Sequence, residues 1–214
     1  MRIYVASSNP GKLRDFRYAA ATTGSGVELL PLPGLKDIAA PPEDELTFAG
    51  NARVKALYYA GFAGGELVLA DDSGLEVAAL NGAPGVRSAR YAEDLRFQSE
   101  REMTTDERNN AALLSALDAV QATDRSGRYR CALALAAGSE IVAVAEGSLE
   151  GTLLQQPRGE AWFVYDPLFL VTEAGVSEAG VPEDGMTMEE LPPALRMDLS
   201  HRGRALRNLL RALA

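Results

Sequence analysis

The stretch Ala70-Asp71-Asp72-Ser73-Gly74-Leu75 follows directly on an apolar run that begins at Leu67. A buried strand that delivers carboxylates at its carboxyl end is a common way for an α/β fold to present polar chemistry. Adjacent residues of a strand point to opposite faces, so Asp71 and Asp72 are predicted to face different surroundings. Taken alone, Asp-Asp-Ser-Gly also favours a turn, since each of these residue types has local reasons to adopt one. The motifs in the rest of the chain favour the strand.

The composition is that of a globular protein. The chain has 214 residues, of which 47% are hydrophobic and 24% charged, and its net charge is -9. Such an acidic chain is not expected to bind nucleic acid, which needs a basic face, although a small anionic ligand remains possible. No signal peptide is recognised, and no apolar run approaches the roughly 18 residues of a membrane span. The sequence therefore predicts a cytoplasmic enzyme or binding protein with neither a nucleic-acid nor a membrane partner.

The choice of basic residues is uneven. Eighteen arginines stand against three lysines, which are Lys12, Lys36 and Lys55. Two of the three, Lys12 and Lys55, fall inside motifs described below. Because the chain uses arginine almost everywhere else, the lysines in these motifs indicate that a compact ammonium is needed there.

The amino-terminal segment has the pattern of a strand, a small polar loop and a helix. An apolar run at Ile3-Tyr-Val-Ala6 predicts the strand, and a helical pattern follows Lys12. Hydroxyls, backbone N–H groups and a helix dipole in this arrangement favour a phosphate, and a lysine adds charge. The loop consists of Ser7, Ser8, Asn9, Pro10, Gly11 and Lys12. A capped helix start with a solvated lysine is the alternative interpretation.

Further elements follow in alternation. A second strand is predicted at Val27–Leu30, and Thr47 is predicted to cap a helix that contains Lys55, with Gly50 where a capping box would have Glu or Gln. An ordered loop is predicted at 81–91, a long helix at Thr105–Val120, and an acidic surface loop at 173–190.

The second half of the chain adds antiparallel strands. The apolar runs 129–137 and 141–149 are joined by Gly138-Ser-Glu140, which is a hairpin signal. Antiparallel strands after βα units predict an α/β fold with a mixed sheet and two lobes. Near the carboxyl end, Ser200 is predicted to cap a last helix. Beside it, His201 and Arg202 offer donors that suit an anion or the edge of a base, or else form a solvated turn.

Several short motifs stand in one order along nearly the whole chain. They are Ser7-x-Asn9-x-x-Lys12, Thr47-Phe-x-x-Asn51-Ala-x-x-Lys55, Ala70-Asp-Asp-Ser-Gly-Leu75, Gly82-Ala-Pro-Gly-Val86, Tyr165-Asp-Pro167 and Ser200-His-Arg-Gly-Arg204. Each is weak by itself, but together they closely resemble the inosine triphosphate pyrophosphatase family, also called the Ham1 family.

The resemblance implies a fold and an activity. The fold would be a single α/β domain over residues 1–214, with two lobes around a long mixed β-sheet and a central active-site cleft. The reaction would be hydrolysis of the purine nucleoside triphosphates ITP, dITP or XTP to the monophosphate and pyrophosphate. Mg2+ would be the cofactor, and the enzyme would be a homodimer.

The resemblance also implies roles for individual residues. Ser7 to Lys12 match the phosphate-binding loop, Lys55 a second phosphate lysine, Asp72 the metal-binding proton acceptor and Ser73 an adjacent substrate contact. The base-binding residues would be Phe163, Val164, Tyr165, Asp166, His201 and Arg202, with Arg196 where the family carries a lysine. Donors from the histidine–arginine pair would match the C6 oxygen of hypoxanthine or xanthine and oppose the amine of adenine.

Three departures from the family pattern concern the metal and the base. Val164 replaces a glycine, Gly50 replaces a glutamate, and Pro42 stands where many members have an acidic metal ligand. Glu43 is therefore predicted to serve as a metal ligand beside Asp72, ahead of its neighbours Asp44 and Glu45, with Asp71 as another candidate. The departures also leave open an alternative function, a nucleotide-binding regulator with weak or lost turnover.

Overall fold

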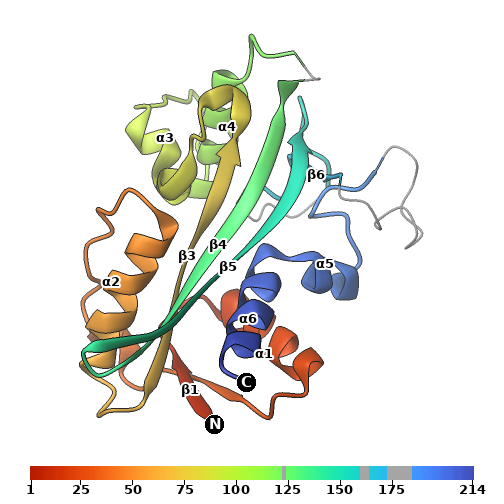
Figure 1. Cartoon of the computed structure of the whole chain (residues 1–214). Coiled ribbons are helices and arrows are strands. Elements are labelled where there is room, and N and C mark those ends of the chain that lie inside the picture. Colours follow the sequence, from red (N-terminus) through yellow and green to blue (C-terminus); the bar gives the residue numbers. More distant parts are fainter. Residues whose placement is uncertain (122–123, 160–163, 173–184) are drawn as a thin grey trace. The chain divides into compact units, whose positions relative to one another are not determined.

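The computed structural model describes residues 1–121, 124–159, 164–172 and 185–214. It contains the strands β1 (Arg2–Val5), β2 (Glu28–Pro31), β3 (Leu67–Val77), β4 (Ser126–Ala137), β5 (Glu140–Leu153) and β6 (Phe169–Val171), and the helices α1 (Pro10–Thr23), α2 (Phe48–Ala60), α3 (Tyr91–Asp94), α4 (Thr105–Ala116), α5 (Pro193–Leu199) and α6 (His201–Ala212) (Figure 1). Short 3-10 helices are η1 (Leu35–Asp37), η2 (Ala78–Leu80) and η3 (Gly85–Arg90).

The strands form one mixed sheet in the order β2-β1-β3-β4-β5-β6. β1 pairs in parallel with both β2 and β3, whereas β5 and β6 are antiparallel. Only Gly138 and Ser139 separate the neighbouring strands β4 and β5, as expected of the predicted hairpin. The predicted α/β class with a mixed sheet is confirmed.

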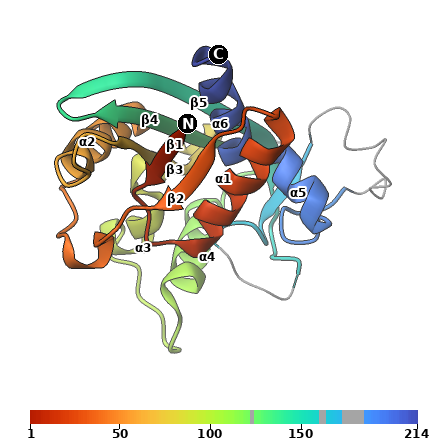
Figure 2. The same cartoon turned by 90° about the horizontal axis from the view of Figure 1, so that it is seen from below.

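The chain divides into two compact units. Unit 1 comprises Met1–Ser73, Arg130–Ser148 and Met197–Ala214, and unit 2 comprises Gly74–Tyr129 and Leu149–Arg196. Within unit 1, α1 and α6 lie on one side of the strands and α2 on the other (Figures 1 and 2). The core between these two helices and the strands is apolar and includes Ile3, Val5, Phe16, Leu69, Leu133, Leu206 and Leu209.

The helices of unit 1 begin where polar side chains cap them. Asn9 accepts hydrogen bonds from the N–H groups of Gly11 and Lys12 at the start of α1. Thr47 accepts from the N–H of Gly50 at 3.0 Å, and Ser200 accepts from the N–H of Gly203 at 2.9 Å. Such caps satisfy amides that have no partner inside the helix. The predicted caps Thr47 and Ser200 are confirmed.

Helix α6 lies directly against β5 at Gly147. A Cβ atom built on Gly147 would overlap the backbone nitrogen of Ala205 and the carbonyl oxygen of His201. A glycine therefore lets the backbone of α6 approach the strand closely, and this contact positions the first turns of α6 against β5.

Three sequence expectations need correction. The strand favoured over a turn for Asp71 to Gly74 is confirmed, but the two aspartates do not end it, because β3 continues to Val77. The segment predicted as a loop at 81–91 contains η3, in which the hydroxyl of Ser88 donates to the carbonyl of Gly85 at 2.6 Å.

The predicted helix at Thr105–Val120 ends at Ala116 instead. The buried guanidinium of Arg125 donates to the carbonyls of Leu117 and Val120, so these groups bond to a side chain and do not extend the helix.

None of the helices in the described part of the chain combines the length and apolarity that crossing a bilayer requires.

Candidate active site

Asp71 and Asp72 occupy adjacent positions in β3 and meet different partners, as the strand pattern predicted. Oδ2 of Asp71 lies 2.7 Å from Nζ of Lys12 in α1. Oδ1 of Asp72 lies 3.0 Å from Nζ of Lys55 in α2. Because α1 and α2 cover opposite sides of the strands of unit 1, each carboxylate meets the lysine of its own side (Figure 1). Both aspartates are buried, at 5% and 7% exposure.

Lys55 connects Asp72 to the loop before α2. Its ammonium lies 3.0 Å from Asp72 and 3.2 Å from Oε1 of Glu43. Burial opposes the charge on Lys55, but three neighbouring carboxylates, led by Asp72, outweigh it and raise the pKa of Lys55. The lysine is therefore a permanent cation at this centre. Glu43, chosen from the sequence over its acidic neighbours Asp44 and Glu45, is the residue that the structure brings to it.

The two aspartates differ in acidity. Burial raises the pKa of Asp72, even though Lys55 and Asn51 favour its charged form. Burial acts in the same direction on Asp71, but Lys12 and Lys55 outweigh it, so the pKa of Asp71 is lowered. A carboxylate with a raised pKa is the better proton acceptor of the two.

Asn51 is a site residue that was not selected from the sequence. Its amide donates to Oδ2 of Asp72 at 3.0 Å, and its Oδ1 accepts from the N–H of Glu45 at 3.0 Å. It is 1% exposed. Asn51 and Lys55 are four residues apart in a helix and therefore share a face. This spacing was the signal in the sequence that both side chains serve one carboxylate.

The polar loop between β1 and α1 is arranged around Asn9. Its side-chain oxygen accepts hydrogen bonds from the N–H groups of Gly11 and Lys12. The N–H of Asn9 donates to the hydroxyl of Ser7 at 3.3 Å. Pro10 is the first residue of α1. Two of the helix amides that were expected to cradle a phosphate are thus engaged within the loop. Lys12 remains the charged group of the loop, paired with Asp71.

His201 and Arg202 lie at the start of α6, close to the charges of the Lys12–Asp71 pair. Burial, together with the positive charges of Arg202 and Lys12, holds the pKa of His201 well below its usual range, so the imidazole is neutral at pH 7. The guanidinium of Arg202 lies 3.7 Å from Asp15 and helps to lower the pKa of Asp71. Unit 1 therefore brings His201 and Arg202 close to Lys12. Ser73 is also near the Lys12–Asp71 pair, since its hydroxyl donates to Asp71 at 3.5 Å.

The remaining predicted residues lie in unit 2. Tyr165 is fully buried, and its hydroxyl donates to the carbonyl of Ser88 at 2.8 Å. Asp166 accepts from the hydroxyl of Tyr129 at 2.9 Å and forms an ion pair with Arg196. Phe163 lies outside the described residues, as does most of the acidic segment 173–190. Unit 2 thus brings Asp166 and Arg196 into contact, and their binding roles stay predictions.

Val164 has a backbone that is unusual for its residue type. Its φ is +52°, in the left-handed region that favours glycine and that a β-branched residue rarely adopts. Two polar side chains of α4 hold this backbone, since Asp106 accepts from the N–H of Val164 at 3.2 Å and Asn110 donates to its carbonyl. The replacement of glycine noted in the sequence therefore adds a side chain to a glycine-like backbone.

The oxygen donors of unit 1 fit a hard cation such as Mg2+. Glu43 and Asp72 supply carboxylate oxygens, and both lie within 3.2 Å of the ammonium of Lys55, which occupies the point that they share. In the described residues, no group of three or more acidic, histidine or cysteine side chains is arranged to hold a metal. Magnesium commonly takes only one or two carboxylates and completes its shell with water and phosphate oxygens. These residues therefore suit a magnesium ion that arrives with a phosphate ligand.

Comparison with known proteins agrees with this geometry. The model of the Ham1 family matches residues 3–212. A protein from Acidobacterium capsulatum named dITP/XTP pyrophosphatase is 49% identical over 213 residues, covering 100% of this chain and 98% of its own length. A protein of the same name from Desulforamulus reducens is 41% identical, covering 100% of this chain and 96% of its own.

Solved structures show the same relationship. A HAM1 protein from Coxiella burnetii superposes with a TM-score of 0.78 at 33% identity, over 100% of this chain and 98% of its own. A dITP/XTP pyrophosphatase from Mycobacterium abscessus gives a TM-score of 0.69 at 36% identity, with both chains fully covered. The match extends over the whole sequence and over the fold that carries the aspartate–lysine pairs, and the chain therefore belongs to the Ham1 family.

Proposed function

We propose that the protein hydrolyses the purine nucleoside triphosphates ITP, dITP and XTP to the monophosphate and pyrophosphate, and so removes them from the nucleotide pool. The names of its relatives support a hydrolase acting on nucleoside triphosphates. The observation that carries the proposal is Asp72, a buried carboxylate of raised pKa held between Lys55 and Asn51. This arrangement suits a general base next to bound phosphates.

The chemistry follows from the charges at the site. A water molecule attacks the α-phosphorus, Asp72 accepts a proton from that water, and the bond to the β-phosphate breaks to release pyrophosphate. The ammonium groups of Lys12 and Lys55 would neutralise phosphate charge, since each is already held in place by a carboxylate. Asp71 would keep Lys12 oriented.

We propose that magnesium is bound through Asp72 and Glu43. Bound there, the ion supplies additional charge neutralisation to the phosphates. The support is the oxygen chemistry of the two carboxylates, which lie near each other because both contact the ammonium of Lys55. Asp71, the other metal candidate from the sequence, is paired with Lys12 at 2.7 Å, and its role as a ligand stays a prediction.

The metal assignment predicts the effect of Glu43→Gln. This variant is expected to raise the Mg2+ concentration needed for half-maximal rate about tenfold, which corresponds to about 1.4 kcal/mol. Asp44→Asn, which removes an exposed carboxylate next in the chain, is the matched control and should leave the titration unchanged. A magnesium titration in which Glu43→Gln matches the wild type would assign the metal to the aspartates of β3 alone.

We also propose that His201 and Arg202 read the C6 oxygen of the base. A neutral imidazole offers one N–H donor and a guanidinium offers several, and the amine of adenine would oppose them. Pyrophosphate release measured on ITP, dITP, XTP, GTP and ATP is the test. We expect kcat/KM for ITP and XTP to exceed that for ATP by about a hundredfold or more, and Arg202→Ala to reduce the ratio. Equal rates on ITP and ATP would reject base reading at this pair.

The same assay separates the enzyme from a nucleotide-binding regulator. A regulator would bind ITP without releasing pyrophosphate. The departures that suggested it are Pro42 and Gly50, and the surroundings of both support the enzyme. Glu43 supplies a carboxylate next to Pro42, and a Cβ on Gly50 would lie 2.8 Å from the Cβ of Glu45, whose side chain occupies that space.

The finer points of assembly and location are part of the proposal. We propose a homodimer, which the family resemblance supports. The substrates proposed are nucleotides of the cytoplasm, which is the compartment that we propose for the protein.

A further inference from the structure

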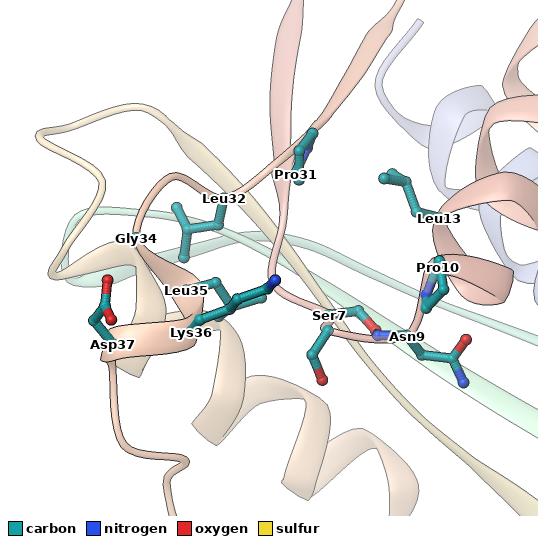
Figure 3. Close-up of a pocket in the computed structure, with 11 residues that line it drawn as sticks. Ser7, Asn9, Pro10, Leu13, Pro31, Leu32, Gly34, Leu35, Lys36 and Asp37 are labelled. Carbon is teal, nitrogen blue, oxygen red and sulfur yellow. The ribbon is translucent and has the colours of Figure 1, made fainter.

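Unit 1 contains a pocket at the carboxyl ends of β1 and β2. It has a volume of about 420 Å³ and lies between the loop that follows β1 and the segment Pro31–Asp37, which begins at the last residue of β2 (Figure 3). This volume lies within the range of small-molecule sites. The carboxyl ends of parallel strands are where open α/β sheets bind ligands, and this pocket lies at the ends of two such strands.

The loop Ser7–Pro10 follows β1, which lies between the strand that borders the pocket and the strand that carries the aspartates. The strand order β2-β1-β3 places β1 between β2, whose end borders the pocket, and β3, which carries Asp71 and Asp72. A ligand that follows this loop from β3 toward β2 would therefore pass from the aspartates into the pocket.

Lys36 is the cation of this pocket. It is exposed in η1, and Figure 3 shows its side chain extending toward the loop that follows β1, whereas the carboxylate of Asp37 points away from that loop. Lys12 and Lys55 are paired with carboxylates at 3.2 Å or less. Lys36 has no such pair within the described residues. Of the three lysines, it is the one whose charge is not already balanced by a paired carboxylate among the described residues.

The other groups of the pocket favour a phosphate over a base. The hydroxyl of Ser7 accepts from the N–H of Asn9, which leaves its own proton available for donation. None of the residues that line the pocket in the described chain is aromatic, so a base would find no ring to stack on. The lining also includes the aliphatic side chains of Leu32 and Leu35. A lysine ammonium is a common phosphate partner, acting as a point charge.

We propose that this pocket binds the terminal phosphate of the triphosphate substrate, with Lys36 as its counter-ion and Ser7 as a hydroxyl donor. The assignment rests on the proposed function, because it names where the end of the same substrate lies. It makes Lys36 a residue that distinguishes triphosphates from shorter nucleotides. Inorganic pyrophosphate, the product that retains the terminal phosphate, would leave from this pocket.

Calorimetric titration of inorganic pyrophosphate and of IMP, with magnesium present, tests the assignment without turnover. Lys36→Ala is expected to raise the Kd for pyrophosphate about tenfold, as expected for loss of one charge-assisted contact, and to leave the Kd for IMP unchanged. Lys36→Arg should retain most of the affinity for pyrophosphate. Arg53→Ala, which removes an exposed cation of α2 that does not line the pocket, is the matched control for net charge.

Other outcomes overturn the assignment. These are an unchanged Kd for pyrophosphate in Lys36→Ala, an equal loss for IMP, an equal loss in Arg53→Ala, or no binding of pyrophosphate by the wild type. The proposed function fails separately, by the absence of pyrophosphate release from ITP. A protein that binds pyrophosphate through Lys36 but does not hydrolyse ITP would retain the anion pocket and lose the enzymatic assignment.

Discussion

Asp72→Asn is expected to lower kcat for ITP hydrolysis by about a thousandfold, the middle of the range for loss of a general base. The substitution keeps the size of the side chain and leaves an oxygen to accept from Asn51. What it removes is the proton acceptor and one of the two carboxylates around Lys55. The fold should persist, since Lys55 keeps Glu43 as a partner. Single-turnover release of pyrophosphate, with circular dichroism as the check on folding, measures the effect.

The pH profile gives an independent reading of the same role. A general base must be deprotonated, so kcat/KM of the wild type should rise with pH through the pKa of Asp72, which burial raises above its ordinary value. Asp72→Asn should lose this acid limb in its residual activity. Asp71→Asn should retain the acid limb and mainly raise KM, because Asp71 pairs with the phosphate-binding Lys12 and is not the proton acceptor. A folded Asp72→Asn variant with near wild-type turnover would contradict the assignment of the base.

The features that were predictable from the sequence are local ones. Alternation along a strand placed Asp71 and Asp72 on opposite sides, and the structure gives them different lysines. Capping chemistry placed the start of α2 at Thr47 and that of α6 at Ser200. Each of these depends on a few neighbouring residues, and the chain carries that information in a short window.

The features that the sequence left open or missed are not decided by one short motif. Asp-Asp-Ser-Gly favours a turn by itself, yet it continues β3 because Lys12 and Lys55, from two separate helices, neutralise carboxylates that would otherwise be costly to bury. The engagement of helix amides by Asn9 is the capped helix start that the sequence left open as an alternative, since asparagine is a preferred N-cap residue. The pocket at Lys36 was missed because it exists only where the ends of β1 and β2, which are distant in sequence, lie side by side.

Gly147→Ala is expected to lower the free energy of unfolding by about 3 kcal/mol, toward the upper end for overpacking. The added Cβ would overlap the backbone of α6 at Ala205 and His201, and backbone atoms cannot turn aside as a flexible side chain can. The expected fall in Tm is about 10 °C for a chain of this size. Gly24→Ala is the matched control, because a Cβ there meets nothing within 4 Å and adds only the cost of its φ of +64°.

The same substitution should also change catalysis. Relief of the overlap requires α6 to move away from β5, and His201 and Arg202 lie on the turn that moves. Within unit 1 this turn supplies charge next to Asp71, so its displacement should raise KM for ITP while Asp72 keeps its partners and kcat falls less. Thermal unfolding and steady-state kinetics on one preparation measure both effects. If Gly147→Ala were as stable as Gly24→Ala with an unchanged KM, α6 would not be held by the close approach of the two backbones, and the position of His201 and Arg202 would need another cause.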